Sequence, residues 1–138
     1  MRLWHHDIIE LLPKSQLLAQ WRELNSIFAK EDRHILINYI YDYPKEHLYT
    51  YTQLVVNEMK NRGFTIRTFD KMNRYFEGID ANKKAELPFA EHHNDEYFEI
   101  CYFNLKEKYL RGQKDFDKSR FHTLVERYKS VQSTKDML

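Results

Sequence analysis

The chain has 138 residues, of which 42% are hydrophobic and 15% aromatic, a size and composition that suit one domain with one core. Only three Gly and three Pro occur, which argues against a turn-rich β-sandwich or barrel and favours a few long helices. The formal net charge is +1, and no apolar run approaches the roughly 18 residues of a membrane span. Charge arrives too early for a signal peptide, and the single cysteine, Cys101, excludes an intrachain disulfide and a cysteine-based metal site. We therefore expect a cytoplasmic protein without a membrane segment.

The first half of the chain shows three stretches with helical spacing of apolar residues. The first follows Pro13 and covers about 15–30, with Ser15 as the expected cap. A second, shorter helix is expected after a capping Asp32, and a third over 45–62, between a proline and a glycine. The residues expected to be buried lie three or four positions apart, as one face of a helix requires: Leu17, Trp21, Leu24 and Phe28 in the first helix, and Leu48, Tyr51, Val55 and Met59 in the third. The second helix is expected to carry Ile35, Leu36, Tyr39 and Ile40.

The second half predicts two further helices, after a stretch over 64–90 that is consistent with only one or two helical turns. The two helices cover about 94–110 and 117–131. Their expected inward residues are Phe98, Cys101, Leu105 and Tyr109, and Phe121, Leu124, Val125 and Tyr128. Strand-like alternation is nowhere sustained. We expect an all-α fold, a single compact domain of four to five helices over 1–132, with residues 133–138 as a flexible tail.

The charges are segregated along the sequence although they nearly cancel. Residues 60–74 hold five basic residues and one acid, 106–129 hold eight basic residues and four acids, and 77–99 hold seven acids and two lysines. Basic stretches can neutralise nucleic-acid phosphates. Ordinary solvated helix faces explain the same pattern equally well.

One carboxylate in the first predicted helix has a suggestive position. Glu23 lies beside Arg22 and at the edge of the stripe that contains Trp21, on the same side of the helix as Gln16, Gln20 and Ile27. A carboxylate that flanks the core next to an arginine can serve as a general acid or base or as an electrostatic stabiliser. A surface glutamate with an arginine neighbour is the alternative that the residues alone leave open.

Four short motifs occur in a particular order: MRLWHHDIIELLP at the start, then LLAQWRELNSIF, DRHILINY and NEMKNRGF. Together they resemble the pyrimidine dimer DNA glycosylase family, the endonuclease V family, over Met1 to about Ile66. The resemblance implies an endonuclease V-like all-α fold and a monomeric DNA-repair glycosylase with associated abasic-site lyase activity. Its partner would be damaged double-stranded DNA, with pyrimidine dimers as the first expected lesion, and it would need no metal and no cofactor.

The resemblance also assigns roles to residues. The amine of Met1 would attack the sugar and form an imine, and Glu23 would stabilise the reacting sugar and assist elimination. Arg2, Arg22 and His34 would position the sugar-phosphate, and backbone phosphates would be contacted by Lys60, Arg62 and Arg67. Met1 should be retained, because Arg2 is too large for methionine removal. An α-amino group with a pKa of about 7.7–8.0 is roughly one-tenth neutral near pH 7, which favours it over lysine as a nucleophile.

Two other functions compete with this hypothesis. Histidines and acids cluster at His5, His6 and Asp7 and again over 92–96, as a metal-dependent helical phosphohydrolase would require. Adjacent residues on a helix face different ways, so we expect His5 and His6 to shape the site or contact DNA. We expect His92 and His93 to lie in a surface loop, apart from any metal. The third possibility is a non-catalytic DNA-binding helical module of the same fold.

Overall fold

The computed structural model describes residues 2–136, and within this range it contains five α-helices, three short 3-10 helices and no strand. The all-α prediction is therefore confirmed. The helices in chain order are η1 (His6–Leu11), α1 (Lys14–Lys30), η2 (Asn38–Asp42), α2 (Lys45–Asn61), α3 (Asp70–Tyr75), η3 (Ala81–Lys83), α4 (Asp95–Leu110) and α5 (Lys118–Asp136).

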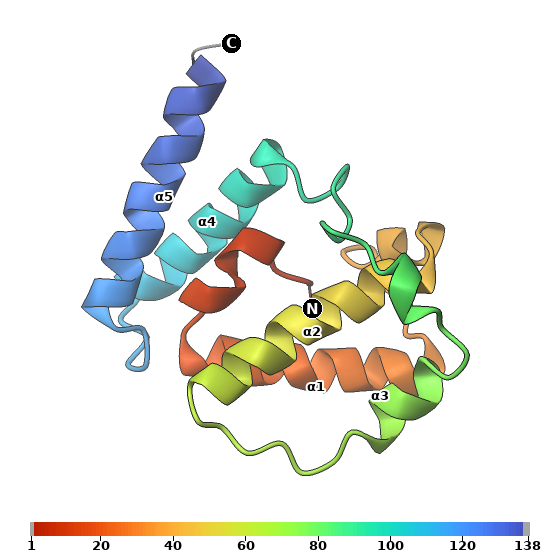
Figure 1. Ribbon diagram of the computed structural model, residues 1–138. Coiled ribbons are helices and arrows are strands. Elements are labelled where there is room, and N and C mark those ends of the chain that lie inside the picture. Colours follow the sequence, from red (N-terminus) through yellow and green to blue (C-terminus); the bar gives the residue numbers. More distant parts are fainter. Residues whose placement is uncertain (1, 137–138) are drawn as a thin grey trace.

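The helices form two groups joined by the N-terminal segment. Helix α1 packs against α2 and α3, and α4 packs along α5. Figure 1 shows the red N-terminal segment and η1 between these groups, and η1 contacts both α2 and α5. One continuous cluster of buried residues runs through all of these contacts.

Helices α1 and α2 follow the predicted periodicity. Leu17, Leu24 and Phe28 of α1 are buried, whereas Trp21 is only partly covered. The expected cap at Ser15 is wrong, because α1 begins directly after Pro13 and Ser15 lies within its first turn. The N–H of Ser15 instead donates to Asp115 Oδ2 (2.7 Å), a partner a hundred residues away. A distant carboxylate thus compensates an N–H group that the helix itself leaves without a partner.

The predicted second helix is not formed as expected. Residues 31–34 are irregular, 35–37 form a turn, and only the short η2 follows. Glu31 ends α1 in the left-handed region (φ 49°), and the N–H of His34 donates to Asn38 Oδ1 (2.8 Å), so local hydrogen bonds replace a helical start. The two apolar residues expected on this helix lie in the turn instead, where Ile35 is 86% exposed and Leu36 37% exposed.

The two helices of the second half are present. Asn94 caps α4 by accepting a hydrogen bond from the N–H of Tyr97 (3.0 Å), and Asp117 accepts one from the N–H of Ser119 (2.8 Å) at the start of α5. The expected end of the last helix near Val131 is wrong, because α5 continues to Asp136. Residues 133–136 are therefore helical, 137–138 lie outside the described range, and flexibility of this end stays a prediction.

Candidate functional site

The first described residues lie extended in the interior of the molecule. Leu3 is fully buried and Trp4 is 8% exposed. The backbone groups of such a segment need hydrogen-bond partners, and side chains supply them here. The Tyr97 hydroxyl donates to the carbonyl of Leu3 (2.6 Å), and the Tyr51 hydroxyl donates to the carbonyl of Trp4 (2.6 Å). The N–H of Trp4 donates to Gln20 Oε1 (2.9 Å). The segment is therefore fixed between α1, α2 and α4.

The same glutamine connects this segment to the predicted catalytic carboxylate. Gln20 Nε2 donates to the carbonyl of Arg2 (3.1 Å) and to Glu23 Oε2 (3.1 Å). The carbonyl of Arg2 and the carboxylate of Glu23 thus accept hydrogen bonds from the same NH₂ group. Met1, the predicted nucleophile, lies outside the described residues, so its position next to Glu23 stays a prediction.

Glu23 has the environment of a group that exchanges protons. Its side chain is half-buried, and burial raises the pKa of its carboxyl above the usual value. The backbone of Arg2, the guanidinium of Arg22 and the amide of Gln20 each act in the opposite direction, because they favour the charged form. A carboxyl whose pKa is raised toward neutrality is better matched to general acid–base catalysis.

The two predicted arginines differ in their surroundings. The guanidinium carbon of Arg2 lies 5.9 Å from the ring centroids of both Trp4 and Tyr97, so its charge rests against aromatic faces. Arg22 is exposed on the outer face of α1. Both arginines are near Glu23, since Arg22 precedes it and Arg2 is linked to it through Gln20.

His34 does not lie on a helix, contrary to expectation. It is exposed in the irregular stretch before η2, and its Nδ1 accepts a hydrogen bond from the N–H of Leu36 (3.1 Å). Within residues 2–136 its hydrogen bonds are all local, and none connects it to Glu23 or Arg22. A role for His34 in substrate binding stays a prediction.

The three residues predicted to contact DNA differ in how free their charges are. Lys60 and Arg67 are exposed. The side chain of Arg62 is only 12% exposed, because its Nε pairs with Glu58 Oε2 (2.7 Å) and its Nη2 donates to the carbonyl of Glu10 (3.0 Å). Lys60 Nζ lies 5.6 Å from the ring centroid of Phe69, an exposed contact that binding of a phosphate can replace more easily than the covered bonds of Arg62.

A group of buried histidines lies behind the N-terminal segment. His93 is 4% exposed, so the expectation that it lies in a surface loop is wrong. Its Nδ1 accepts from the N–H of His6 (3.2 Å), which assigns the ring proton to Nε2, and Nε2 lies 2.6 Å from the Tyr39 hydroxyl. Burial lowers the pKa of His93 to about 2 and that of His5 to about 4, so both rings are held neutral. His92 stacks on Tyr39 with 3.5 Å between ring centroids.

His5, His6 and Asp7 do come together, which adjacent residues were not expected to do. One donor atom from each lies within 4.8 Å of the other two. The 3-10 geometry at the start of η1 explains this, because His5 Nδ1 accepts from the N–H of Asp7 (3.1 Å) and His6 Nδ1 pairs with Asp7 Oδ1 (2.9 Å). Two side-chain atoms of the group, His6 Nδ1 and Asp7 Oδ1, are therefore paired with each other, whereas His5 Nδ1 is bound to a backbone N–H. Among the described residues, those over 92–96 form no comparable group.

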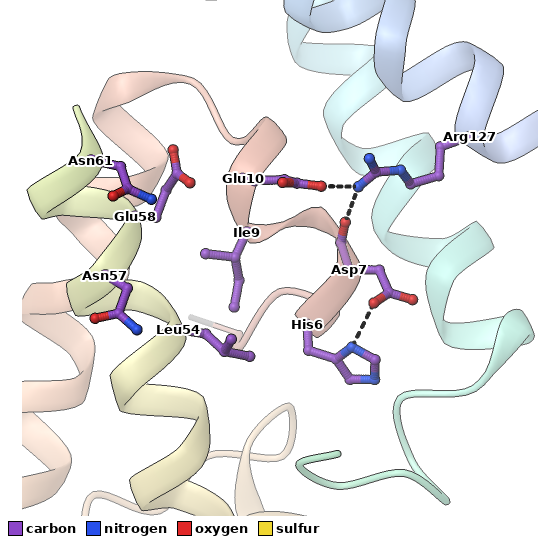
Figure 2. Close-up of a pocket in the computed structure, with 9 residues that line it drawn as sticks. All are labelled: His6, Asp7, Ile9, Glu10, Leu54, Asn57, Glu58, Asn61 and Arg127. Atoms are coloured by element: carbon purple, nitrogen blue, oxygen red, sulfur yellow. Dashed lines mark hydrogen bonds and ion pairs between the residues drawn. The ribbon is translucent and has the colours of Figure 1, made fainter. Parts of the chain in front are cut away.

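A pocket of about 240 Å³ opens on another side of η1, between η1, α2 and α5. Figure 2 shows Arg127 at its edge, paired with Glu10 Oε1 (2.7 Å) and with the carbonyl of Asp7 (2.7 Å). Glu58 adds a further carboxylate to the lining, and Glu23 and Arg22 do not line this pocket. Its acidic lining makes it unsuited to a phosphate group.

Sequence reasoning found Glu23 but not the residues that hold its surroundings. Gln20 was noted only as a neighbour on the same helix side, yet it is 1% exposed and makes four hydrogen bonds. A polar residue between buried Leu17 and Leu24 was the available signal. Tyr51 and Tyr97 gave none, because their hydroxyls bind backbone atoms 47 and 94 residues away.

Comparison with known proteins agrees with these observations. The family model described as pyrimidine dimer DNA glycosylase matches residues 1–72 of the 138, which include the N-terminal segment, α1, η2 and α2. No curated protein matches the chain, and no solved structure does. Within residues 2–136, no helix has the length and apolarity to cross a membrane. With a family match over more than half its length, and with the predicted all-helical fold, the chain belongs to the pyrimidine dimer DNA glycosylase family.

Proposed function

We propose that the protein is a DNA-repair glycosylase with abasic-site lyase activity that works through an imine on the Met1 amine. The observation that carries this proposal is the link from the carbonyl of Arg2 through Gln20 to Glu23. The residue after Met1 is thereby held on the carboxylate-bearing side of α1. An amine attached to such a fixed segment is preorganised toward the carboxylate, which lowers the entropic cost of bringing both to one sugar.

The proposed reaction has two stages. The neutral amine attacks C1′ of the damaged nucleotide, the bond from C1′ to the base breaks, and the base takes up a proton while it stays joined to the other base of the dimer. The sugar ring then opens as nitrogen and C1′ form an imine. Glu23 next removes a proton from C2′, the bond to the 3′ phosphate breaks, and water releases the sugar from the amine. Burial raises the pKa of the Glu23 carboxyl above its usual value, which makes its carboxylate a stronger base for this step.

The proposed substrate is duplex DNA containing a pyrimidine dimer, bound by a monomer without a metal or cofactor. Exposed Arg22, Lys60 and Arg67, together with Arg2 and His34, would contact the sugar-phosphate backbone and fix the position of the duplex. Flipping a base costs a few kcal/mol and least at a damaged step, which gives the preference for a lesion a physical origin.

The test is borohydride trapping with protein that starts at Met1, on duplexes that carry a pyrimidine dimer or an abasic site. We expect a covalent adduct that maps to Met1 and persists in excess chelator. Absence of an adduct from folded protein on both duplexes would contradict the proposal. Loss of activity in chelator would favour a metal-dependent phosphohydrolase instead.

Glu23→Gln tests the second stage separately. We expect strand cleavage to fall by roughly 10²- to 10⁴-fold, while the Met1 adduct on an abasic site still forms. The matched control is Glu77→Gln, a substitution of an exposed glutamate, which should leave cleavage unchanged. Wild-type cleavage by the Glu23 variant would remove Glu23 from the mechanism.

A further inference from the structure

Gln20 makes more hydrogen bonds to the site than any predicted site residue. Its carboxamide is almost completely buried, and all four of its hydrogen-bonding positions are used. Oε1 accepts from the N–H of Trp4 (2.9 Å), and it lies 2.8 Å from the Tyr51 hydroxyl, whose single proton it shares with the carbonyl of Trp4. Nε2 donates to the carbonyl of Arg2 and to Glu23 Oε2, both at 3.1 Å.

The partners determine which way this amide faces. The backbone N–H of Trp4 can only donate, and the carbonyl of Arg2 can only accept. A flipped amide would place its oxygen against the carbonyl of Arg2 and its NH₂ group against the N–H of Trp4, which would leave buried polar groups without partners. Gln20 therefore has one orientation, with its donor side toward Arg2 and Glu23.

The acceptor side and the donor side of the amide differ in whether other residues make equivalent hydrogen bonds. The acceptor side shares its task with other residues, because Tyr51 also binds the carbonyl of Trp4 and Tyr97 binds that of Leu3. On the donor side, no other side chain among residues 2–136 hydrogen-bonds to both Arg2 and Glu23. Loss of the donor side would thus affect the position of the N-terminal backbone relative to Glu23 more than it affects the stability of the segment as a whole.

We propose that Gln20 is a positioning residue that holds the nucleophile-bearing N-terminal backbone and Glu23 in a fixed relation for imine chemistry. This inference rests on the proposed function. Gln20 itself touches no reacting atom, and it acts through the carbonyl of Arg2 and the carboxylate of Glu23. Its bond to the carboxylate also favours the charged form, so it keeps the pKa of Glu23 lower than burial alone would set it.

The test compares two substitutions. Gln20→Met keeps the approximate shape and removes all four bonds. Gln20→Glu keeps acceptors for the N–H of Trp4 and for Tyr51, but in either protonation state it offers at most one donor for Arg2 and Glu23. If Gln20→Met does not fold, Gln20→Glu still tests the donor side. The control is Tyr51→Phe, which removes the hydroxyl contacts to Gln20 Oε1 and to the carbonyl of Trp4 and leaves the donor side of the amide intact.

For Gln20→Met and Gln20→Glu we expect kcat for cleavage of an abasic-site duplex to fall about 10- to 100-fold, as a small misplacement of reacting groups does. KM should change little, because exposed basic residues make the proposed DNA contacts. In Gln20→Met the acid limb of the kcat profile should move to higher pH, with a matching rise in the pKa of the Glu23 carboxyl measured by ¹³C NMR. Tyr51→Phe should lower the unfolding midpoint without moving the acid limb.

The outcomes separate the two proposals. A wild-type protein that gives no borohydride adduct overturns the imine mechanism and the positioning role with it. A wild-type protein that gives the adduct, together with folded Gln20 variants that have unchanged kcat and an unmoved acid limb, overturns the role of Gln20 alone. A loss of activity that only tracks the loss of stability, as in Tyr51→Phe, also contradicts it.

Discussion

His93 is a histidine that the fold has withdrawn from acid–base chemistry. Its Nδ1 lone pair receives the N–H of His6 and its Nε2 proton is directed to Tyr39. Protonation of His93 Nδ1 would break its hydrogen bond with the N–H of His6 and would place a charge in an apolar environment. His5 is held neutral nearby for a similar reason, since its Nδ1 accepts from the N–H of Asp7. Both residues therefore link stability to pH.

We expect the protein to lose stability when the pH falls below about 6.5. In the unfolded chain both histidines have a pKa near 6.5. In the folded protein the pKa is about 4 for His5 and about 2 for His93. The unfolded state binds more protons in this window. The free energy of unfolding should therefore drop by about 1.4 kcal/mol per pH unit for each histidine. Urea unfolding between pH 7.5 and 5 measures this slope.

His93→Asn retains an acceptor for the N–H of His6 and removes one of the two titrating groups. Its stability should depend on pH about half as steeply as that of the wild type. His122→Asn, a substitution of an exposed histidine, should leave the slope as it is. An equal slope in all three proteins would show that the buried rings are not the cause.

The element that ties the two helix groups together is the short η1. Its C-terminal carbonyls cannot be satisfied within so short a helix, and arginines from two other helices bind them. The carbonyl of Glu10 accepts from Arg62 (3.0 Å) and from Arg120 (3.1 Å), and Arg127 also donates to the carbonyl of Asp7 in the first turn of η1 (2.7 Å). Positive charge at a helix C-terminus is also favourable for electrostatic reasons. Helices α2 and α5 are thus joined through η1.

Arg62→Gln should therefore affect stability more than DNA binding. The substitution removes a largely buried guanidinium from Glu58 and from the carbonyl of Glu10. Chemical denaturation should show a loss of about 1–3 kcal/mol, as expected when a covered polar group loses its partner. Arg67→Gln, at an exposed position, should change stability by less than about 0.5 kcal/mol. Equal stability of the two variants would contradict the structural role of Arg62.

The sequence predicts well those helices whose apolar spacing and end residues are visible within the helix and next to it. Helix α2 lies between Pro44 and Gly63, and α4 begins at Asn94, so spacing and caps suffice to place them. The helix expected after Asp32 does not form, because the hydrogen bond between His34 and Asn38 stabilises a turn at this place. The spacing of Ile35 and Leu36 gives no sign of this turn, and both side chains are exposed.

The candidate site also contains some residues that the sequence could predict and others that it could not. Glu23 and Arg22 could be predicted because they stand in a short motif on a regular helix. The interior course of Leu3 and Trp4 could not, because its hydrogen-bond partners lie 16, 47 and 94 residues away along the chain. The buried state of His93 depends on a contact across 87 residues with His6. No local pattern in the sequence carries such information.

At the scale of the whole molecule, a net charge of +1 gives little general attraction to DNA. Affinity for a duplex must then come from a few phosphate contacts. The logarithm of the binding constant should fall with the logarithm of salt concentration by about 0.9 for each phosphate neutralised. Lys60→Gln and Arg67→Gln should each reduce this slope by about one, measured by fluorescence anisotropy at several salt concentrations. Slopes equal to that of the wild type would place the DNA on another surface.

The interior N-terminal segment has a consequence for the order in which the protein matures. During synthesis, residues 3–6 leave the ribosome about ninety residues before Tyr97 and His93, to which they are bonded in the finished fold. The first residues made are thus among the last to find their places, and closure of contacts so distant in sequence slows folding. A nascent chain that has completed α1 and α2 already contains Glu23, but it lacks the α4 residues that hold the segment beside it. Gln20 and Tyr51 are available to that chain from the start, but the segment gains its remaining bonds only after most of the chain has been translated.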